Sequence, residues 1–548
     1  MVLKKIHYLF RFYFTVRHLK VRQLFYRVYY RFRKVKFSAV SGIKKNNAFD
    51  IAHIYCWKSF EANDFQSFEF MGLKGGLDWH SSCRPKLWLY NLHYLDGLIS
   101  CTPISLIEKS RLLNRWISSN PPFEGCGWEP YPLSLRIVNI VKWFHDQPSL
   151  QDGWLNSLAT QTQALSVQVE YHVLANHLFA NGKALVFAGS YFEGGQARAW
   201  LSQGLKILDA EIKEQFLTDG AHFELSPMYH ASLLWDMCDL VNLASHTNIE
   251  SLRSRIPSWK QIVEHGIVWL RDMQHPDGEI PFFNDSAFKI APNLQQVEGY
   301  ATSLGCLPAN SNINPDSLHG VCHCESGYGA IYFGADCKAL LNFSRIAPAY
   351  QPGHAHADTL SFELSLFGQR VFVNSGTSLY EDCPERLRQR GTAAHNTVEI
   401  DCENSSEVWA GFRVARRANV ILEEFEVELD TVKFSCSHDG YARLHGKNIH
   451  FREWSARSNQ LKITDRIAGK YCVAKSRLYV HPSAIVTLHG EHVVITMPSG
   501  QVIHVLFHGA DKVNILESTW HPEFGVAIAN KCIVTEFGGG ALITTVDW

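Results

Sequence analysis

The chain has 548 residues, of which 46% are hydrophobic and 19% are charged. This composition excludes a disordered chain, and the length exceeds what one ordinary core serves, so at least two large domains are expected. A formal net charge of −1 excludes a general attraction to polyanions, so we expect no nucleic-acid partner and only local contacts to any acidic ligand.

The N-terminal segment 1–48 begins with 36 residues that are rich in Lys, Arg and aromatic residues and contain no acid. Arg11 and Arg17 interrupt its apolar runs, so no secretory h-region of about 7–15 residues is present. No later run approaches the roughly 18 apolar residues of a membrane span. Two interpretations stay open: an amphipathic segment on an anionic membrane surface or a partner, or a basic helix docked on the protein's own body.

Residues 49–312 are predicted to be mainly helical. Leu133, Ile137, Ile140 and Phe144 follow the spacing of one helix face. The stretches 156–190, 196–217, 228–246 and 258–274 have the same pattern. Successive helices joined by short loops predict helical hairpins, which in sufficient number can close into a ring.

Two clusters of this helical region could carry chemistry. In the predicted helical stretch 171–177, His172 and Asn176 share a face, while His177 is turned away by about 100°. Ser226 followed by Pro227 predicts a helix start, which places Tyr229 in the first turn. Each cluster also has a purely structural interpretation. Asn176 and the two histidines would be packing or capping groups, and Tyr229 would be a partly buried tyrosine with a hydrogen-bonded hydroxyl.

Residues 313–548 change to short alternating runs separated by Gly, Asn and Asp, which predicts an antiparallel β-sandwich. The clearest runs are KALLNFS, LSFELSLF, RVFVNSG, NTVEID, HVVITM, VIHVLF, CIVTEF and ALITTV. Between the second and third runs, Gly368 and Gln369 are predicted to form a two-residue hairpin turn of type II′.

A third cluster, His354, His356 and Asp358, precedes the run LSFELS. On an extended backbone both imidazoles point to one face, and Asp358 joins them if the strand continues. His395 offers a further imidazole. Such a group indicates a metal site or a base with its orienting partner. This cluster alone would also be consistent with a metal-dependent hydrolase. That alternative gives no role to Tyr229.

Eight segments of the chain are WLYNLHYLD, GWEPYPLSLR, NHLFANGKAL, DGAHFELSPMYH, DGEIPFFNDS, GHAHADTLSFELS, AAHNTVEID and HDGYARL. In this order they resemble segments of the heparinase II/III-like polysaccharide lyases. The resemblance implies an α+β multidomain fold, an incomplete (α/α) toroid followed by an antiparallel β-sandwich. It also implies β-elimination at a uronic acid unit of an acidic polysaccharide. The alternative is a non-lytic protein that binds such a polysaccharide or helps to assemble a capsule or surface glycan.

The resemblance also implies roles for individual residues. Asn176 would hydrogen-bond the uronate carboxylate, Tyr229 would act as base and acid, and His354 would be the alternative base. Substrate contacts are predicted for His177, Arg136, Trp128, Glu224 and Arg390.

Some members of this family hold a metal in the sandwich, and the matching ligands here would be His356, Asn374 and His395. An amide oxygen is a poorer zinc ligand than a carboxylate. A structural Zn²⁺ would therefore bind weakly, recruit Asp358 or a water, or be absent. No organic cofactor is expected.

The expected location rests on two further observations. The 14 Cys follow no paired spacing, so we expect reduced thiols rather than a disulfide framework. With the N-terminus, this predicts a cytoplasmic or inner-membrane-associated protein, whereas the family resemblance implies the periplasm.

Overall fold

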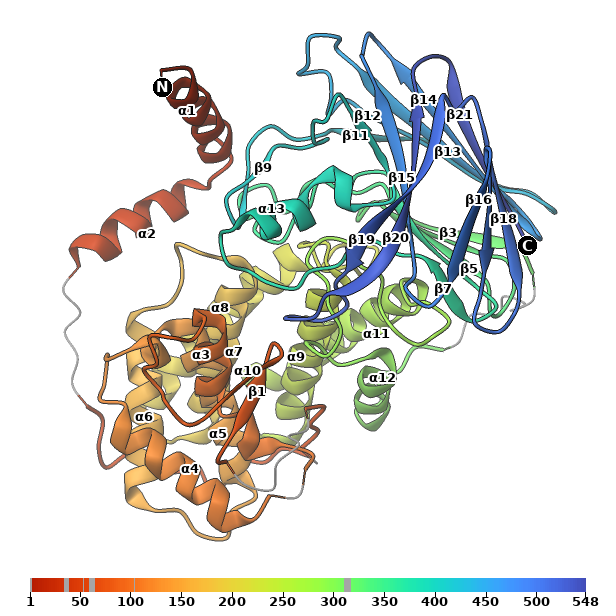
Figure 1. Cartoon of the computed structure of the whole chain (residues 1–548). Helices are drawn as coiled ribbons and strands as arrows, with labels where there is room; N and C mark the ends of the chain where they lie inside the picture. The colour runs from red at the N-terminus through yellow and green to blue at the C-terminus, as the bar shows by residue number, and fades with distance from the viewer. Residues whose placement is uncertain (1, 34–38, 53, 59–64, 103, 310–316) are drawn as a thin grey trace.

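A computed structural model describes residues 2–33, 39–52, 54–58, 65–102, 104–309 and 317–548. Figure 1 shows a helical body formed by the N-terminal half of the chain and a body of β-sheets formed by the C-terminal half. Two N-terminal helices lie at one side of these bodies. The predicted helical toroid followed by an antiparallel sandwich is therefore confirmed.

The N-terminal helices are α1 (Val2–Val16) and α2 (Val21–Phe32). The helical body begins with a short hairpin of β1 (Phe68–Phe70) and β2 (Leu73–Gly75). Its helices are α3 (Lys86–Tyr94), α4 (Leu106–Ser119), α5 (Pro130–His145), α6 (Asp152–Val167), α7 (Ala175–Tyr191), α8 (Gly195–Gln215), α9 (Pro227–His246), α10 (Glu250–Arg253), α11 (Ile256–Asp272) and α12 (Leu294–Ser303).

Helix α7 lies at the centre of the helical body. Every one of its residues except His177 is buried. The ammonium groups of Lys142 on α5 and Lys183 on α7 both bind the carboxylate of Asp239 on α9. These ion pairs are buried, so they join the three helices through the interior.

The sandwich contains two large antiparallel sheets. One has the order β19-β20-β15-β7-β6-β5-β4-β3, with β8 also paired to β15, and the other has the order β11-β12-β13-β14-β21-β18-β17-β16. Their strands are β3 (His319–His323), β4 (Tyr328–Tyr332), β5 (Lys338–Asn342), β6 (Ser361–Leu366), β7 (Gln369–Phe372), β8 (Val398–Ile400), β11 (Val420–Val427), β12 (Val432–His438), β13 (Ile449–Arg457), β14 (Gln460–Ala468), β15 (Ala474–Val480), β16 (Ile485–His489), β17 (His492–Thr496), β18 (Val502–His508), β19 (Lys512–Trp520), β20 (Ile528–Phe537) and β21 (Ala541–Asp547). A short helix, α13 (Pro384–Arg390), and the small pair β9 (Val408–Trp409) and β10 (Arg413–Val414) lie in the connections.

The sheet that contains β6 is covered on both faces. All six residues of β6 are buried. One face packs on the other sheet, and the other face meets the helical body, where Tyr328 on β4 contacts Trp269 on α11 with ring centroids 5.6 Å apart. This contact fixes the two bodies against each other and positions the loops between them.

Most predicted elements are present with small changes of boundary. All eight predicted runs contain strands. The predicted boundary at 312/313 lies outside the described residues, between α12 and β3. The hairpin turn was predicted one residue too late: Leu366 pairs with Gln369, so Phe367 and Gly368 form the turn. Both have positive φ (56° and 72°), which is typical of type I′ and not of type II′.

The cysteine prediction was wrong for four of the 14 residues. Cys56 is bonded to Cys101 and Cys322 to Cys324, while the other ten are free thiols. Cys56 and Cys101 are 45 residues apart, so their spacing gave no sign that the fold brings their Cα atoms within 5.8 Å. Among the helices that the structure describes, none combines the length and the apolar character needed to span a membrane.

Candidate active site

Side chains of the helical body and of the sandwich meet where α7 and α9 begin. The rings of Tyr229 and His354 are in contact, with centroids 4.0 Å apart. The Nε2 atom of His354 lies 3.5 Å from Oε2 of Glu224. The other oxygen of Glu224 accepts a hydrogen bond from the backbone N–H of Asn176 at 3.1 Å. The structure thus brings the three predicted catalytic residues and Glu224 together from two domains.

The start of α9 places Tyr229 as the sequence predicted. Ser226 caps the helix, since its Oγ accepts a hydrogen bond from the backbone N–H of Tyr229 at 3.2 Å. The same hydroxyl donates to the carbonyl of Asp285 at 2.6 Å. The cap therefore joins the helix of Tyr229 to the loop of Asp285.

Asn176 reaches the site in a different way from the prediction. Helix α6 ends at Val167 and α7 begins at Ala175, so the stretch 171–174 is not helical. Leu174 and Ala175 have positive φ (68° and 55°), and this turn starts the helix immediately before Asn176. The shared helix face predicted for His172 and Asn176 is therefore wrong. The ring of His172 instead contacts Tyr30 of α2.

Asp285 is the carboxylate that orients the histidines, and the sequence analysis missed it. Its Oδ2 lies 3.0 Å from Nδ1 of His354, and its Oδ1 lies 2.8 Å from Nε2 of His356. Arg386 on α13 binds both oxygens. Burial opposes ionisation, but Arg386 and the two imidazoles hold the pKa of Asp285 well below its ordinary value.

The ionised Asp285 fixes the tautomer of His354. A carboxylate only accepts hydrogen bonds, so in the neutral imidazole Nδ1 of His354 carries the proton and Nε2 has a free lone pair. Asp358, the predicted partner, turns away and accepts the backbone N–H of Asn284 at 3.0 Å. Burial raises the pKa of Asp358 to about 7. The two histidines do converge, but on a carboxylate from a distant loop.

Tyr380, also missed by the sequence analysis, completes the surroundings of Tyr229. The two hydroxyl oxygens are 3.2 Å apart. Burial, with a further effect of Tyr380, raises the pKa of Tyr229 well above its ordinary value. Tyr229 is therefore a protonated phenol at neutral pH, which suits a proton donor.

His177 lies beside Asn176, and its surroundings favour the charged imidazolium. Its Nδ1 lies 3.0 Å from Oε1 of Glu170, and its ring contacts Tyr131 at 4.3 Å between centroids. Burial opposes the charged form, but Glu170 and then Glu224 raise the pKa of His177 above its ordinary value. Burial raises the pKa of Glu224 itself. Among the described residues, Oε2 of Glu224 has no hydrogen-bond partner, and Nε2 of His354 is 3.5 Å from it.

Three predicted substrate contacts lie in the interior instead, namely Arg136, Trp128 and Arg390. Trp128 is 4% exposed, and its indole N–H donates to the carbonyl of Asn120. Arg390 is fully buried and donates to the carbonyls of Ala355 and Ala410. These side chains hold loops in place, because their polar atoms are already bonded inside the protein.

A substitution at Arg136 tests whether these buried side chains have a structural role. Its guanidinium donates to Oε1 of Gln161 and to the carbonyls of His93 and Gly127. Arg136→Met is expected to lower the free energy of unfolding by about 1–3 kcal/mol for each carbonyl left unpaired. Turnover per folded molecule and KM should stay unchanged. A raised KM with unchanged thermal stability would restore Arg136 as a substrate contact.

Two of the three predicted metal ligands face each other. Nδ1 of His356 and Nε2 of His395 are 3.1 Å apart. Nε2 of His356 must donate its proton to Asp285, and Nδ1 of His395 must donate its proton to the carbonyl of Gly391. Two lone pairs therefore point at each other, which fits a cation between them.

Asn374 is the least suitable of the three predicted metal ligands. It is fully buried, its Oδ1 accepts the backbone N–H of Asn396, and its Nδ2 has no hydrogen-bond partner in the described part of the chain. Over the described ranges of the chain, no group of three or more His, Cys, Asp and Glu is placed to hold a metal. An ion here would have two imidazoles and at most an amide.

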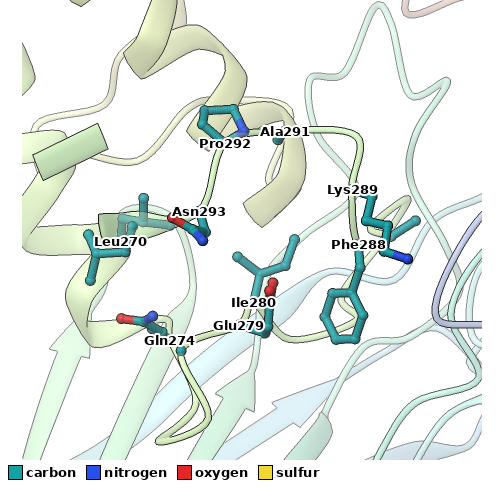
Figure 2. Close-up of a pocket in the computed structure, with 12 residues that line it drawn as sticks. Leu270, Gln274, Glu279, Ile280, Phe288, Lys289, Ala291, Pro292 and Asn293 are labelled. Atoms are coloured by element: carbon teal, nitrogen blue, oxygen red, sulfur yellow. The ribbon is translucent and has the colours of Figure 1, made fainter. Parts of the chain in front are cut away.

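A separate small pocket lies beside α11 (Figure 2). It is lined by Leu270, Gln274, Glu279, Phe288 and Asn293 among others, and its volume is about 20 Å³. This volume holds about one water molecule. The pocket therefore has no room for a sugar ring and is no alternative to the site at Tyr229 and His354.

Comparison with known proteins agrees with this architecture. The chain is 26% identical over 299 residues to a heparin-sulfate lyase of Bacteroides stercoris, covering 50% of this chain and 44% of that protein. It is 25% identical over 380 residues to a heparin-sulfate lyase of Bacteroides thetaiotaomicron, covering 61% of this chain and 52% of that protein. The chain thus spans about half the length of these curated relatives.

Solved structures of the same kind have the same fold. The crystal structure of heparinase III matches with a TM-score of 0.70 at 18% identity, covering 95% of this chain and 88% of that one. A heparan sulfate lyase mutant from Pedobacter heparinus matches with a TM-score of 0.62 at 18% identity, covering 88% and 81%.

Family comparison covers both domains. Residues 110–314 match the heparinase II/III N-terminus, and residues 324–548 match the heparinase II/III-like C-terminal domain. The chain belongs to the heparinase II/III-like family.

Proposed function

We propose that the protein is a polysaccharide lyase that cleaves a uronic-acid-containing glycan by β-elimination. The observation that carries the proposal is the contact between Tyr229 of the helical body and His354 of the sandwich, whose ring is oriented by Asp285. The relatives named heparin-sulfate lyases support the same class of substrate.

The geometry supports a division of roles. The C5 proton of the uronate is transferred to the free Nε2 of His354, which is the base. The C4–O4 bond then breaks, and the protonated Tyr229 gives its proton to the departing O4. The product carries a double bond between C4 and C5.

Two further groups would stabilise the charge that develops on the uronate carboxylate during proton abstraction. Asn176 would donate its side-chain amide to this carboxylate, and His177 would contribute its positive charge. Glu224 accepts the backbone N–H of Asn176 and so fixes the start of α7 beside the carboxylate.

Ultraviolet absorbance of an unsaturated uronate tests the proposal directly. Purified protein is to be incubated with heparan sulfate, alginate, hyaluronan and bacterial capsular polysaccharides, and absorbance followed with time. At least one glycan should produce a rise that the double variant Tyr229→Phe, His354→Ala does not produce. Binding of a glycan without any rise would favour the non-lytic alternative, a binding or surface-glycan assembly protein.

We also propose a structural Zn²⁺ between His356 and His395, with Asn374 as a weak third ligand. The facing lone pairs of the two rings support it. When bound, the ion would fix the two rings relative to each other. Elemental analysis of protein purified without chelator should give about one zinc per chain, and His395→Ala should abolish it. Wild-type protein free of zinc under these conditions would contradict the assignment.

We further propose that α1 and α2 make peripheral contact with a membrane and that the protein resides at the inner membrane surface. The basic, acid-free N-terminal segment supports this location.

A further inference from the structure

The outward face of α2 is apolar along its whole length. Its positions follow the spacing of a single helix face. They are Val21, Leu24, Phe25, Val28, Tyr29 and Phe32, each between 42% and 82% exposed. Together they line an open groove that no other described element shares. Figure 1 shows α2 at one side of the molecule.

The opposite face of α2 carries the polar contacts to the protein. Gln23 is fully buried, and its Nε2 donates to the carbonyl of Val173 in the helical body and to that of Tyr350 in the sandwich. Tyr30 donates to the carbonyl of Val169 at 2.6 Å. A surface helix ordinarily buries its apolar face and exposes its polar face. Helix α2 instead exposes its apolar face and uses its polar side chains to contact the protein. Packing within the fold therefore does not account for the exposed apolar face.

Helix α1 also exposes apolar side chains. It contacts the sandwich through Thr15, whose Oγ1 lies 3.3 Å from the carbonyl oxygen of Val414 and accepts the indole N–H of Trp409. Tyr8, Leu9, Phe10, Phe12 and Tyr13 are each about half exposed or more. In the described part of the chain, α1 and α2 hold 11 of the 26 exposed large apolar side chains. Attachment at several points holds this surface in a fixed orientation.

The charge around this surface indicates its partner. The first 36 residues hold 11 of the 52 Lys and Arg residues and none of the 53 acids, so the remaining chain has 12 more acidic than basic residues. Arg17, Arg22 and Arg31 are exposed beside the apolar face. Basic residues next to exposed aromatic residues are typical of helices that lie in the interface of an anionic bilayer. An anionic surface would attract the helices and repel the acidic body.

We propose that the outward faces of α1 and α2 form a docking surface for an anionic lipid bilayer. This inference rests on the proposed membrane contact and is independent of the lyase activity. The apolar side chains enter the boundary between headgroups and acyl chains, while the arginines pair with lipid phosphates. Because the polar face is held on both domains, the bound molecule has a single orientation on the membrane.

Vesicle binding of the full chain tests the proposal. Co-sedimentation with vesicles of phosphatidylcholine alone is to be compared with vesicles that also contain phosphatidylglycerol. Binding should be at least tenfold stronger to the anionic vesicles and should weaken at high salt. The double variant Phe25→Glu, Phe32→Glu should lose at least tenfold in binding while its thermal unfolding midpoint is unchanged, since both side chains face solvent.

The matched control places the same two charges at exposed apolar positions outside α1 and α2. Leu429→Glu with Ile485→Glu, on the sandwich, should bind anionic vesicles like the wild type, since both side chains are exposed there. No binding by the wild type would overturn both the docking surface and the membrane contact. Binding that the α2 variant leaves unchanged would overturn this surface alone. A lipid-free dimer that the α2 variant dissociates would assign the face to a second copy.

Discussion

Replacement of Asp285 by Asn is expected to lower the free energy of unfolding by about 3–5 kcal/mol, because Arg386 stays buried without its partner. Turnover of the remaining folded protein should fall at least about 10²-fold. An amide has a donating NH2 group in place of one of the two accepting oxygens, so it no longer holds Nδ1 of His354 and Nε2 of His356 as donors together. Part of the His354 population would then carry its proton on Nε2. In those molecules Nε2 has no lone pair to accept the C5 proton.

The sandwich supplies a matched control for this variant. Asp465 is equally buried, and it binds Arg452 through both oxygens and Nε2 of His450 at 2.7 Å. Asp465→Asn should therefore destabilise the protein by a similar amount but leave turnover per folded molecule unchanged. The folded fraction is measured by circular dichroism at the assay temperature. If both variants lower turnover equally, the effect is one of stability, and Asp285 has no orienting role.

Replacement of Tyr229 by Phe is expected to lower kcat by about 10²–10⁴-fold, the range of a general acid. The substitution removes only the hydroxyl, since the phenyl ring keeps the contact with His354 and the Ser226 cap involves the backbone. The thermal unfolding midpoint should therefore change little. Unsaturated product is followed by its ultraviolet absorbance on the best glycan from the screen.

Tyr380→Phe is the control for Tyr229→Phe. It breaks the same contact between the two hydroxyls, but it leaves the hydroxyl of Tyr229 in place. Its kcat should stay within about tenfold of the wild type, well short of the loss expected for a general acid. Equal losses in the two variants would mean that the pair of hydroxyls, and not Tyr229 as the acid, is what the reaction needs.

Local chemistry explains the parts of this structure that could be predicted from the sequence. Ser226 and Pro227 begin α9 because a hydroxyl cap and a proline suit the first turn of any helix, and Tyr229 follows from that alone. The alternating runs of the sandwich likewise form strands. The observed hairpin turn begins one residue before the predicted one, because Phe367 adopts a positive φ. Residue preferences disfavour this conformation for an aromatic side chain.

The missed parts depend on contacts between distant segments. His356 and Asp285 are 71 residues apart, and Arg386 and Asp285 are 101 apart, so no spacing rule connects them. Asp358 is near His354 in sequence, but the chain from 353 to 358 is not a strand, so sequence proximity does not bring its carboxylate to the imidazoles. Arg136 and Arg390 resembled substrate contacts, although burial decides their role and a lone sequence does not show it.

The nearly complete burial of α7 limits how substrate choice could be engineered. Of its 17 residues, His177 alone is not enclosed by neighbours. Saturation libraries along this helix should thus return stably folded proteins mainly with changes at that single codon, because the other positions are constrained by packing. Changes of recognition are better sought at Tyr131 and in the loop of Tyr380, because His177 would also supply charge to the uronate carboxylate.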